Sequence, residues 1–153
     1  MASEPQWYDT ISLPALLRYA RNTYGAAMRR ALDEAGYDDI PKNGLYVIGG
    51  LALEAGNAPL SVLIRDLRIS KQSAGQLIDT LVARGYLKRS EDAQDRRRLV
   101  IALTARGRAA ARVQADARNR IDAKLTERIG DAGVGKLRRM LALLGSFGRD
   151  DTE

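Results

Sequence analysis

Apolar residues recur at helical spacing in long segments near both ends of the chain. The first segment covers residues 12–35, with Pro14 in its first turn and Gly36 after its end. A second segment covers 104–129, and after a short turn a third covers 134–147. Each segment carries apolar side chains along one side, so three helices are predicted here.

Three shorter helices are predicted between these segments. They cover residues 41–55, 61–67 and 70–84, with a break at 68–69 and a stop at Gly85. The 70–84 helix has apolar residues at i, i+3, i+4, i+7 and i+8, which leaves its opposite face polar. The 41–55 helix contains three glycines, each costing about 1 kcal/mol of helix propensity relative to alanine. We expect close packing against another helix to offset this cost.

After Gly85 the apolar period changes to two. Residues 86–90 and 97–103 are predicted to form two strands, joined by a polar turn region at 91–94. The chain is therefore expected to be mainly α-helical, with about six helices and a small β-hairpin. A short helix, a tight turn, a second helix and a hairpin, in this order, are typical of a winged helix-turn-helix, in which the hairpin is the wing.

Positive charge is concentrated in one part of the chain. The 25 Lys+Arg and 19 Asp+Glu residues give a formal net charge of +6. Residues 59–112 hold 12 basic and 5 acidic residues (+7), which leaves 13 basic and 14 acidic (−1) elsewhere. A clustered basic surface attracts phosphate backbones, and this one coincides with the predicted winged helix-turn-helix.

Composition excludes several classes of site. The chain has no His and no Cys, which excludes zinc sites of the Cys/His type, disulfides, thiol nucleophiles and Ser-His dyads. Residues 130–136 fit G-x-x-x-x-G-K, but Leu137 follows and no strand precedes, so we expect a turn between helices and not a phosphate-binding loop. We expect neither an enzyme nor a bound cofactor. With no charged and apolar leader and no long apolar run, the sequence predicts a cytoplasmic protein.

The exposed side of the 70–84 helix suits the reading of DNA. The major groove admits one α-helix, and its base edges are read by short polar or basic side chains. Helix starts favour phosphate, and a hairpin can place an arginine in the minor groove. The candidate DNA-binding residues are Ser61, Ser70, Lys71, Gln72, Ser73, Gln76, Lys88, Arg89, Asp95, Arg96, Arg97 and Arg98.

Several motifs resemble the multiple-antibiotic-resistance regulator (MarR) family. They are the runs 85–89 (Gly-Tyr-Leu-Lys-Arg), 95–97 (Asp-Arg-Arg) and 103–104 (Leu-Thr), followed by Gly107, with 70–73 (Ser-Lys-Gln-Ser) at the start of the candidate recognition helix. The order of helices extends the resemblance over about residues 10–148. It implies a homodimeric, ligand-responsive transcription regulator on pseudo-palindromic operators, in which Asp95 orients the wing and Arg97 enters the minor groove.

Two residues depart from the family pattern. Gly75 stands inside the recognition helix, where it either permits close approach to DNA or softens the helix. Arg68 replaces a small residue in the turn and is either a phosphate contact or a solvated side chain.

The resemblance also divides the chain into regions. Residues 1–36 form an N-terminal arm and dimerisation helix, 37–104 the DNA-binding region, 105–148 the C-terminal dimerisation helices and 149–153 a tail. Two recognition helices must reach successive major grooves, so the terminal helices are expected to build a homodimer.

The resemblance implies a ligand pocket between the first two helices and the long helix, and we expect it to hold a small aromatic or anionic molecule. Its candidate residues are Trp7, Arg18, Tyr19, Tyr24 and Tyr46. The lack of Cys and His excludes sensing by thiol oxidation or by a His-bound metal. The alternatives are an architectural, weakly specific DNA-binding protein without an effector and a protein-interaction module. A membrane-bound basic helix is disfavoured because the predicted helix over 104–128 is sparse in large apolar residues.

Overall fold

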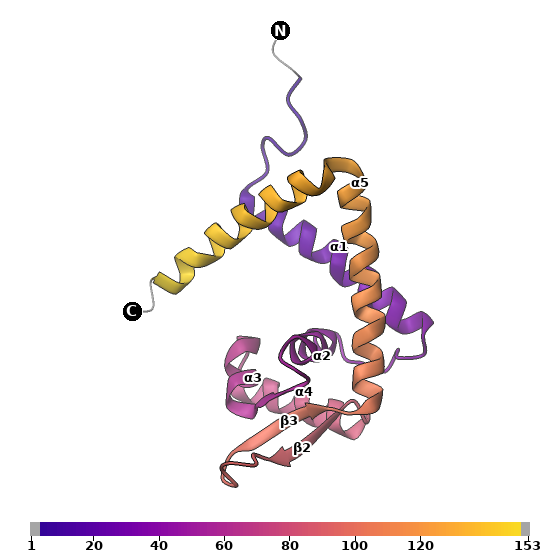
Figure 1. The fold of residues 1–153 in the computed structure, drawn as a ribbon, viewed down its shortest axis with the longest axis vertical. Helices are drawn as coiled ribbons and strands as arrows, with labels where there is room; N and C mark the ends of the chain where they lie inside the picture. Colours follow the sequence, from indigo (N-terminus) through magenta and orange to yellow (C-terminus); the bar gives the residue numbers. More distant parts are fainter. Residues whose placement is uncertain (1–3, 151–153) are drawn as a thin grey trace. The chain divides into compact units, whose positions relative to one another are not determined.

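A computed structural model describes residues 4–150 and confirms the mainly helical fold with a small antiparallel sheet (Figure 1). The elements in chain order are α1 (Leu13–Glu34), α2 (Gly44–Leu53), β1 (Asn57–Pro59), α3 (Leu60–Leu67), α4 (Lys71–Ala83), β2 (Leu87–Glu91), β3 (Leu99–Leu103) and α5 (Ala105–Asp150). The chain divides into two compact units, one up to Ala117 and one from Arg118 onward. Each unit is described by itself.

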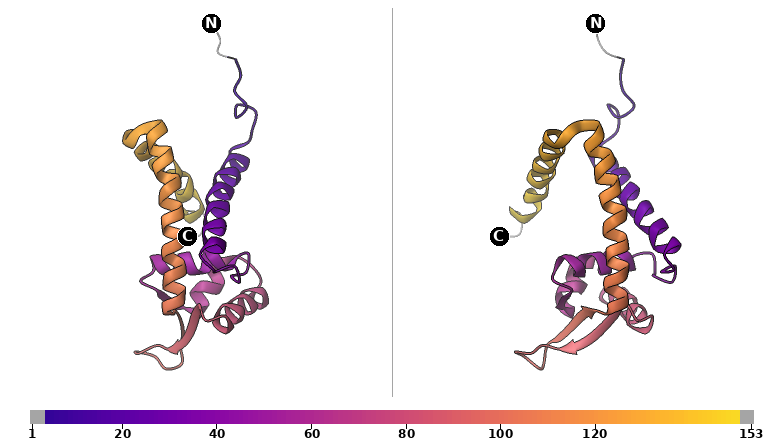
Figure 2. Two further views of the ribbon diagram at one scale, coloured as in Figure 1. Left: turned by 90° about the vertical axis from the view of Figure 1, so that its right-hand side faces the viewer. Right: turned by 45° about the vertical axis from the view of Figure 1, so that its right-hand side comes forward.

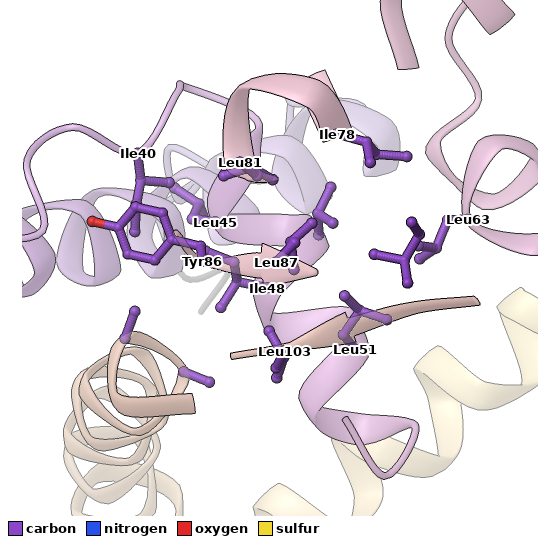
Figure 3. Close-up of a cluster of buried hydrophobic side chains, with 14 of the residues drawn as sticks. Ile40, Leu45, Ile48, Leu51, Leu63, Ile78, Leu81, Tyr86, Leu87 and Leu103 are labelled. Carbon is purple, nitrogen blue, oxygen red and sulfur yellow. The ribbon is translucent and has the colours of Figure 1, made fainter. Parts of the chain in front are cut away.

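The core of the first unit lies among α2, α4 and the strands, as Figure 3 shows. Ile48, Leu51, Ile78 and Leu81 are completely buried there, as is the ring of Tyr86. The predicted apolar side of the 70–84 segment is thus the buried side of α4. This burial fixes which side chains of α4 point outward.

The sheet has the strand order β1-β3-β2, and both pairs are antiparallel. The hairpin pairs Leu87 with Leu103 and Glu91 with Leu99. Its connecting loop projects from the helices of this unit in both views of Figure 2.

The strand β1 was not predicted from the sequence, which indicated only the helices 41–55 and 61–67 on either side of it. The chain turns there through two residues of positive φ, Ala55 at 58° and Gly56 at 87°. It then pairs three residues with β3. A strand this short has no visible period, and its Pro59 is tolerated because β1 lies at the sheet edge.

Two predicted boundaries near the DNA-binding region were wrong. The second helix starts at Gly44 and not at residue 41. The returning strand starts at Leu99, so Arg97 and Arg98 lie in the turn before it. Turn hydrogen bonds around Asp95 shorten this strand.

The glycines of α2 confirm the expected close packing at two of three positions. A Cβ on Gly44 would lie 3.1 Å from Leu81 Cδ2, and one on Gly49 would lie 3.1 Å from Gln114 Oε1. A Cβ on Gly50 would meet nothing within 4 Å, so the expectation was wrong for Gly50.

The predicted turn at 130–133 is reduced to one residue. Gly130 alone has non-helical angles inside α5, with φ 69° and ψ 168°, so the last two predicted helices join into one kinked helix. The expected tail at 149–153 begins as helix through Asp150. Residues 151–153, and residues 1–3 of the expected N-terminal arm, lie outside the described residues.

Candidate nucleic-acid interface

The start of α4 is capped by its own residues. Ser70 Oγ accepts a hydrogen bond from the backbone N–H of Ser73 at 3.1 Å, and the Ser70 hydroxyl donates to Ser73 Oγ at 2.8 Å. This cap holds Lys71 at the first helical position, where remaining free N–H groups favour an anion. Lys71, Gln72, Ser73 and Gln76 are all exposed. The predicted reading face is therefore open to a ligand.

The turn between α3 and α4 contains a left-handed residue. Arg68 has φ 51° and ψ 33°, and its side chain is exposed. A non-glycine residue in this conformation costs of order 1 kcal/mol. No ion pair of Arg68 is found among the described residues.

Asp95 organises the loop of the wing. Its Oδ1 accepts from the backbone N–H of Arg97 at 3.0 Å, and its backbone carbonyl accepts from the N–H of Arg98 at 2.9 Å. The N–H of Asp92 closes the loop on the carbonyl of Arg98 at 3.0 Å. Asp95 is thus occupied with the backbone of the loop, while the side chains of Arg96, Arg97 and Arg98 are exposed.

One groove brings α3, α4 and the wing together. It has a volume of about 440 Å³. Its lining consists of Leu60, Ser61, Ile64, Lys71, Arg97, Arg98 and Leu99. Three cations and no carboxylate line it, and four of its residues were predicted from the sequence as DNA-binding. We call it the DNA groove.

Arg89 is not a free cation. Its guanidinium donates to the carboxylate of Asp79, on the exposed side of α4, and both side chains are partly exposed. Lys88, the neighbouring candidate on β2, is exposed. Sequence spacing could not predict the pair, because it joins a helix to a strand across the fold.

The expected ligand residues do not come together as one pocket. A second groove of about 370 Å³ lies between α1 and α2. Its lining is Arg18, Arg21, Asn22, Gly25, Ala26, Arg29, Lys42, Asn43, Leu45 and Tyr46. Arg18 and Tyr46 thus line it, whereas Trp7, Tyr19 and Tyr24 do not, and α5 takes no part in this lining.

The other aromatic candidates have contacts elsewhere. Trp7 packs edge-on against Tyr8, with ring centroids 5.7 Å apart, and Tyr19 lies under the guanidinium of Arg18 at 5.6 Å. Tyr24 packs against the core. The aromatic character of a residue therefore did not predict whether it lines the groove, packs in the core or lies on the surface.

Within the described residues, no helix is long and apolar enough to cross a membrane.

Residues 40–98 match a family model described as MarR family. No curated protein sequence matches this chain. The matched segment begins just before α2 and ends in the wing, so it contains every residue that lines the DNA groove except Leu99.

Solved structures share the fold along most of the chain. Streptococcus pneumoniae FabT in complex with DNA has a TM-score of 0.74 at 20% identity, over 90% of this chain and 96% of that chain. A mutant of Escherichia coli MarR complexed with operator DNA has a TM-score of 0.67 at 18% identity, over 92% and 99%. NadR in complex with 4-hydroxyphenylacetate has a TM-score of 0.70 at 22% identity, over 94% and 97%.

Proposed function

Because residues 40–98 match the model of the MarR family, we propose that this chain is a sequence-specific transcription regulator, acting as a repressor on pseudo-palindromic operators. The observation that carries the proposal is the DNA groove, where the start of α4 and the wing present Lys71, Arg97 and Arg98 without a carboxylate among the lining residues. Such a regulator acts in the cytoplasm, on chromosomal DNA.

The candidate residues take different parts in this interface. We assign base contacts to Gln72, Ser73 and Gln76, because they are short or amide side chains on the exposed face of α4. Arg97 is assigned to the minor groove, since the loop ordered by Asp95 leaves its side chain free.

The remaining candidates are assigned to the DNA backbone. Ser70 and Lys71, at the start of α4, suit a phosphate. Ser61, Lys88, Arg96 and Arg98 are exposed groups that suit phosphates. Arg89 acts indirectly, by neutralising the carboxylate of Asp79 that would otherwise repel the backbone.

The proposal includes a homodimer. The helix α5 after Gly130 exposes Leu137, Met140, Leu144 and Phe147, with more than a third of each residue's surface open. In the other unit, Leu13 of α1 is 68% exposed. Exposed apolar stripes of this kind mark protein–protein contacts, and a two-fold dimer places two α4 helices on two half-sites.

A ligand that releases DNA is proposed for the groove between α1 and α2. Arg18, Arg21, Arg29 and Lys42 line it with no carboxylate among the lining residues, so it suits an anion. The guanidinium of Arg21 lies 4.6 Å from the ring centroid of Tyr46, which offers an aromatic surface beside the charges. An aromatic carboxylate combines both features.

The test is binding to an operator, obtained by selecting genomic fragments with the purified protein. Arg97→Ala should weaken operator binding strongly, while sedimentation shows an unchanged dimer; unchanged affinity would remove Arg97 from the interface. The alternative of an architectural protein predicts a small ratio of specific to non-specific affinity, where a regulator shows about 10³ or more. Aromatic acids added to the complex should release the DNA from the wild type and not from Arg21→Gln.

A further inference from the structure

Three segments that are distant in the sequence meet at the base of the wing. Asp39 comes from the loop between α1 and α2, Tyr86 from the junction of α4 and β2, and Arg106 from the first turn of α5. The Tyr86 hydroxyl donates to Asp39 Oδ1. Arg106 Nη2 donates to the Asp39 oxygens at 3.3 and 3.4 Å and to the Tyr86 hydroxyl oxygen at 2.9 Å. Each of the three groups therefore contacts the other two.

Neighbouring groups hold the cluster in place. The ring of Tyr86 is completely buried, and the Arg106 guanidinium lies 4.6 Å from its centroid. The ring of Tyr37 lies on the same guanidinium at 5.7 Å. Arg84, at the end of α4, donates to the backbone carbonyl of Asp39. Figure 3 shows the Tyr86 ring beside Leu45 and Ile40, with its oxygen pointing away from the core.

The backbone of Tyr86 is tied to α5 as well. The Thr104 hydroxyl lies 3.1 Å from the Tyr86 carbonyl oxygen and 2.5 Å from that of Gly85. Gly107 lies so close that a Cβ at this position would collide with the Tyr86 carbonyl. Tyr86 is therefore held through its backbone by α5 and through its hydroxyl by the α1–α2 loop.

Tyr86 also stands between the two elements that face DNA. The helix α4 ends at Ala83 and the wing begins at Leu87. Tyr86 therefore lies in the three-residue connection through which the wing leaves α4. None of Asp39, Tyr86 and Arg106 lines the DNA groove.

We propose that Asp39, Tyr86 and Arg106 are positioning residues, which hold the wing at the angle to α4 that operator binding requires. The part of this inference that concerns DNA binding rests on the proposed function. The part that concerns the position of the wing in the free protein does not. The helix α1 forms one wall of the proposed ligand groove. The cluster connects the loop that follows this helix to the wing.

The protonation states of Asp39 and Tyr86 allow their hydrogen bond to persist at physiological pH. The hydrogen bond from Tyr86, assisted by the charge of Arg106, holds the pKa of Asp39 below its usual value. Burial, together with the hydrogen bond to Asp39, raises the pKa of Tyr86 to about 12. The carboxylate therefore stays ionised and the hydroxyl protonated through the physiological range.

The test compares Tyr86→Phe, which removes only the hydroxyl, with Tyr37→Phe, which changes the other ring beside Arg106. Hydrogen exchange of the free protein should show faster exchange of β2 and β3 amides in Tyr86→Phe and unchanged exchange in Tyr37→Phe. Arg106→Lys keeps the charge but lacks the planar guanidinium. It should reproduce the effect and serves as the second variant if Tyr86→Phe folds poorly.

Binding to the operator is the second readout. Tyr86→Phe should lose about tenfold in specific affinity, equivalent to one hydrogen bond to a charged group, with non-specific affinity unchanged. If Tyr86→Phe lost equal affinity for operator and non-specific DNA, the cluster would only stabilise the fold. The same conclusion would follow if the variant were less stable but bound the operator with wild-type affinity. Unchanged exchange of the wing amides would overturn the inference even if the wild type bound its operator. A wild type without operator preference would instead overturn the proposed function.

Discussion

Replacing Lys71 by glutamine removes one positive charge from the DNA groove of each protomer. Lys71 is exposed at the first position of α4 and shares the groove with Arg97 and Arg98. If Lys71 neutralises one phosphate, its loss changes the slope of log K against log salt by about 0.9 per contact. A dimer loses two contacts, so its slope should become shallower by about 1.8.

This difference is large enough to measure. Between 50 and 200 mM salt, a slope difference of about 1.8 means that the variant loses about tenfold less affinity than the wild type. Fluorescence anisotropy with a labelled operator at four or five salt concentrations gives both slopes. Lys42→Gln is the matched control: it removes the same charge from the other groove and should leave the slope unchanged. Parallel lines for Lys71→Gln and the wild type would refute the phosphate contact.

Three further predictions concern the fold and its pH dependence. Gly107→Ala should destabilise the protein by about 3 kcal/mol or more, because its Cβ would collide with the Tyr86 carbonyl; denaturant unfolding measures this, and a neutral result would contradict the close contact. Gly75→Ala should raise stability by up to about 1 kcal/mol, since a Cβ there meets nothing within 4 Å; a lower melting temperature would show a contact that the structure lacks. The pKa of Tyr86 is raised from 10.0 to about 12, so the stability that this shift contributes is complete below pH 10 and is lost between pH 10 and 12, by at most about 3 kcal/mol at about 1.36 kcal/mol per pH unit. Tyr86→Phe should lack this part of the alkaline loss when unfolding is compared across that range.

The helices were predictable because their signals are local. Ser70 with Ser73 marks the start of α4, and the apolar spacing from Ala74 to Val82 identifies its buried side. Once that side is buried, the exposure of Gln72 and Gln76 follows. The change of period after Gly85 gave the hairpin for the same reason.

The contacts that connect elements could not be predicted in this way. Asp39, Tyr86 and Arg106 are separated by 47 and 20 positions. The pair of Asp79 and Arg89 likewise depends on the angle between a helix and a strand. Such contacts follow from the packing of the whole unit, for which a single sequence carries no local pattern.

The turns could be predicted only in part from the sequence. Asp95 in the loop of the wing was expected from the family pattern, and its hydrogen bond to the N–H of Arg97 gives that position a physical reason. The length of the loop was not predicted, because turn hydrogen bonds hold two residues that were expected to belong to the returning strand. In α5, the φ value of Gly130 allows a kink without a loop, so four residues expected as a turn became one.

The most direct test of the account is selection of binding sites from random double-stranded DNA by the purified protein. A homodimer that reads with two α4 helices should enrich an inverted repeat whose half-site centres lie about 10 base pairs, or 34–36 Å, apart. Its flanks should prefer the narrow minor grooves of A·T-rich sequence, where Arg97 is placed. Enrichment of no sequence, or of a single unrepeated half-site, would contradict the claim that this chain is a dimeric, sequence-specific regulator.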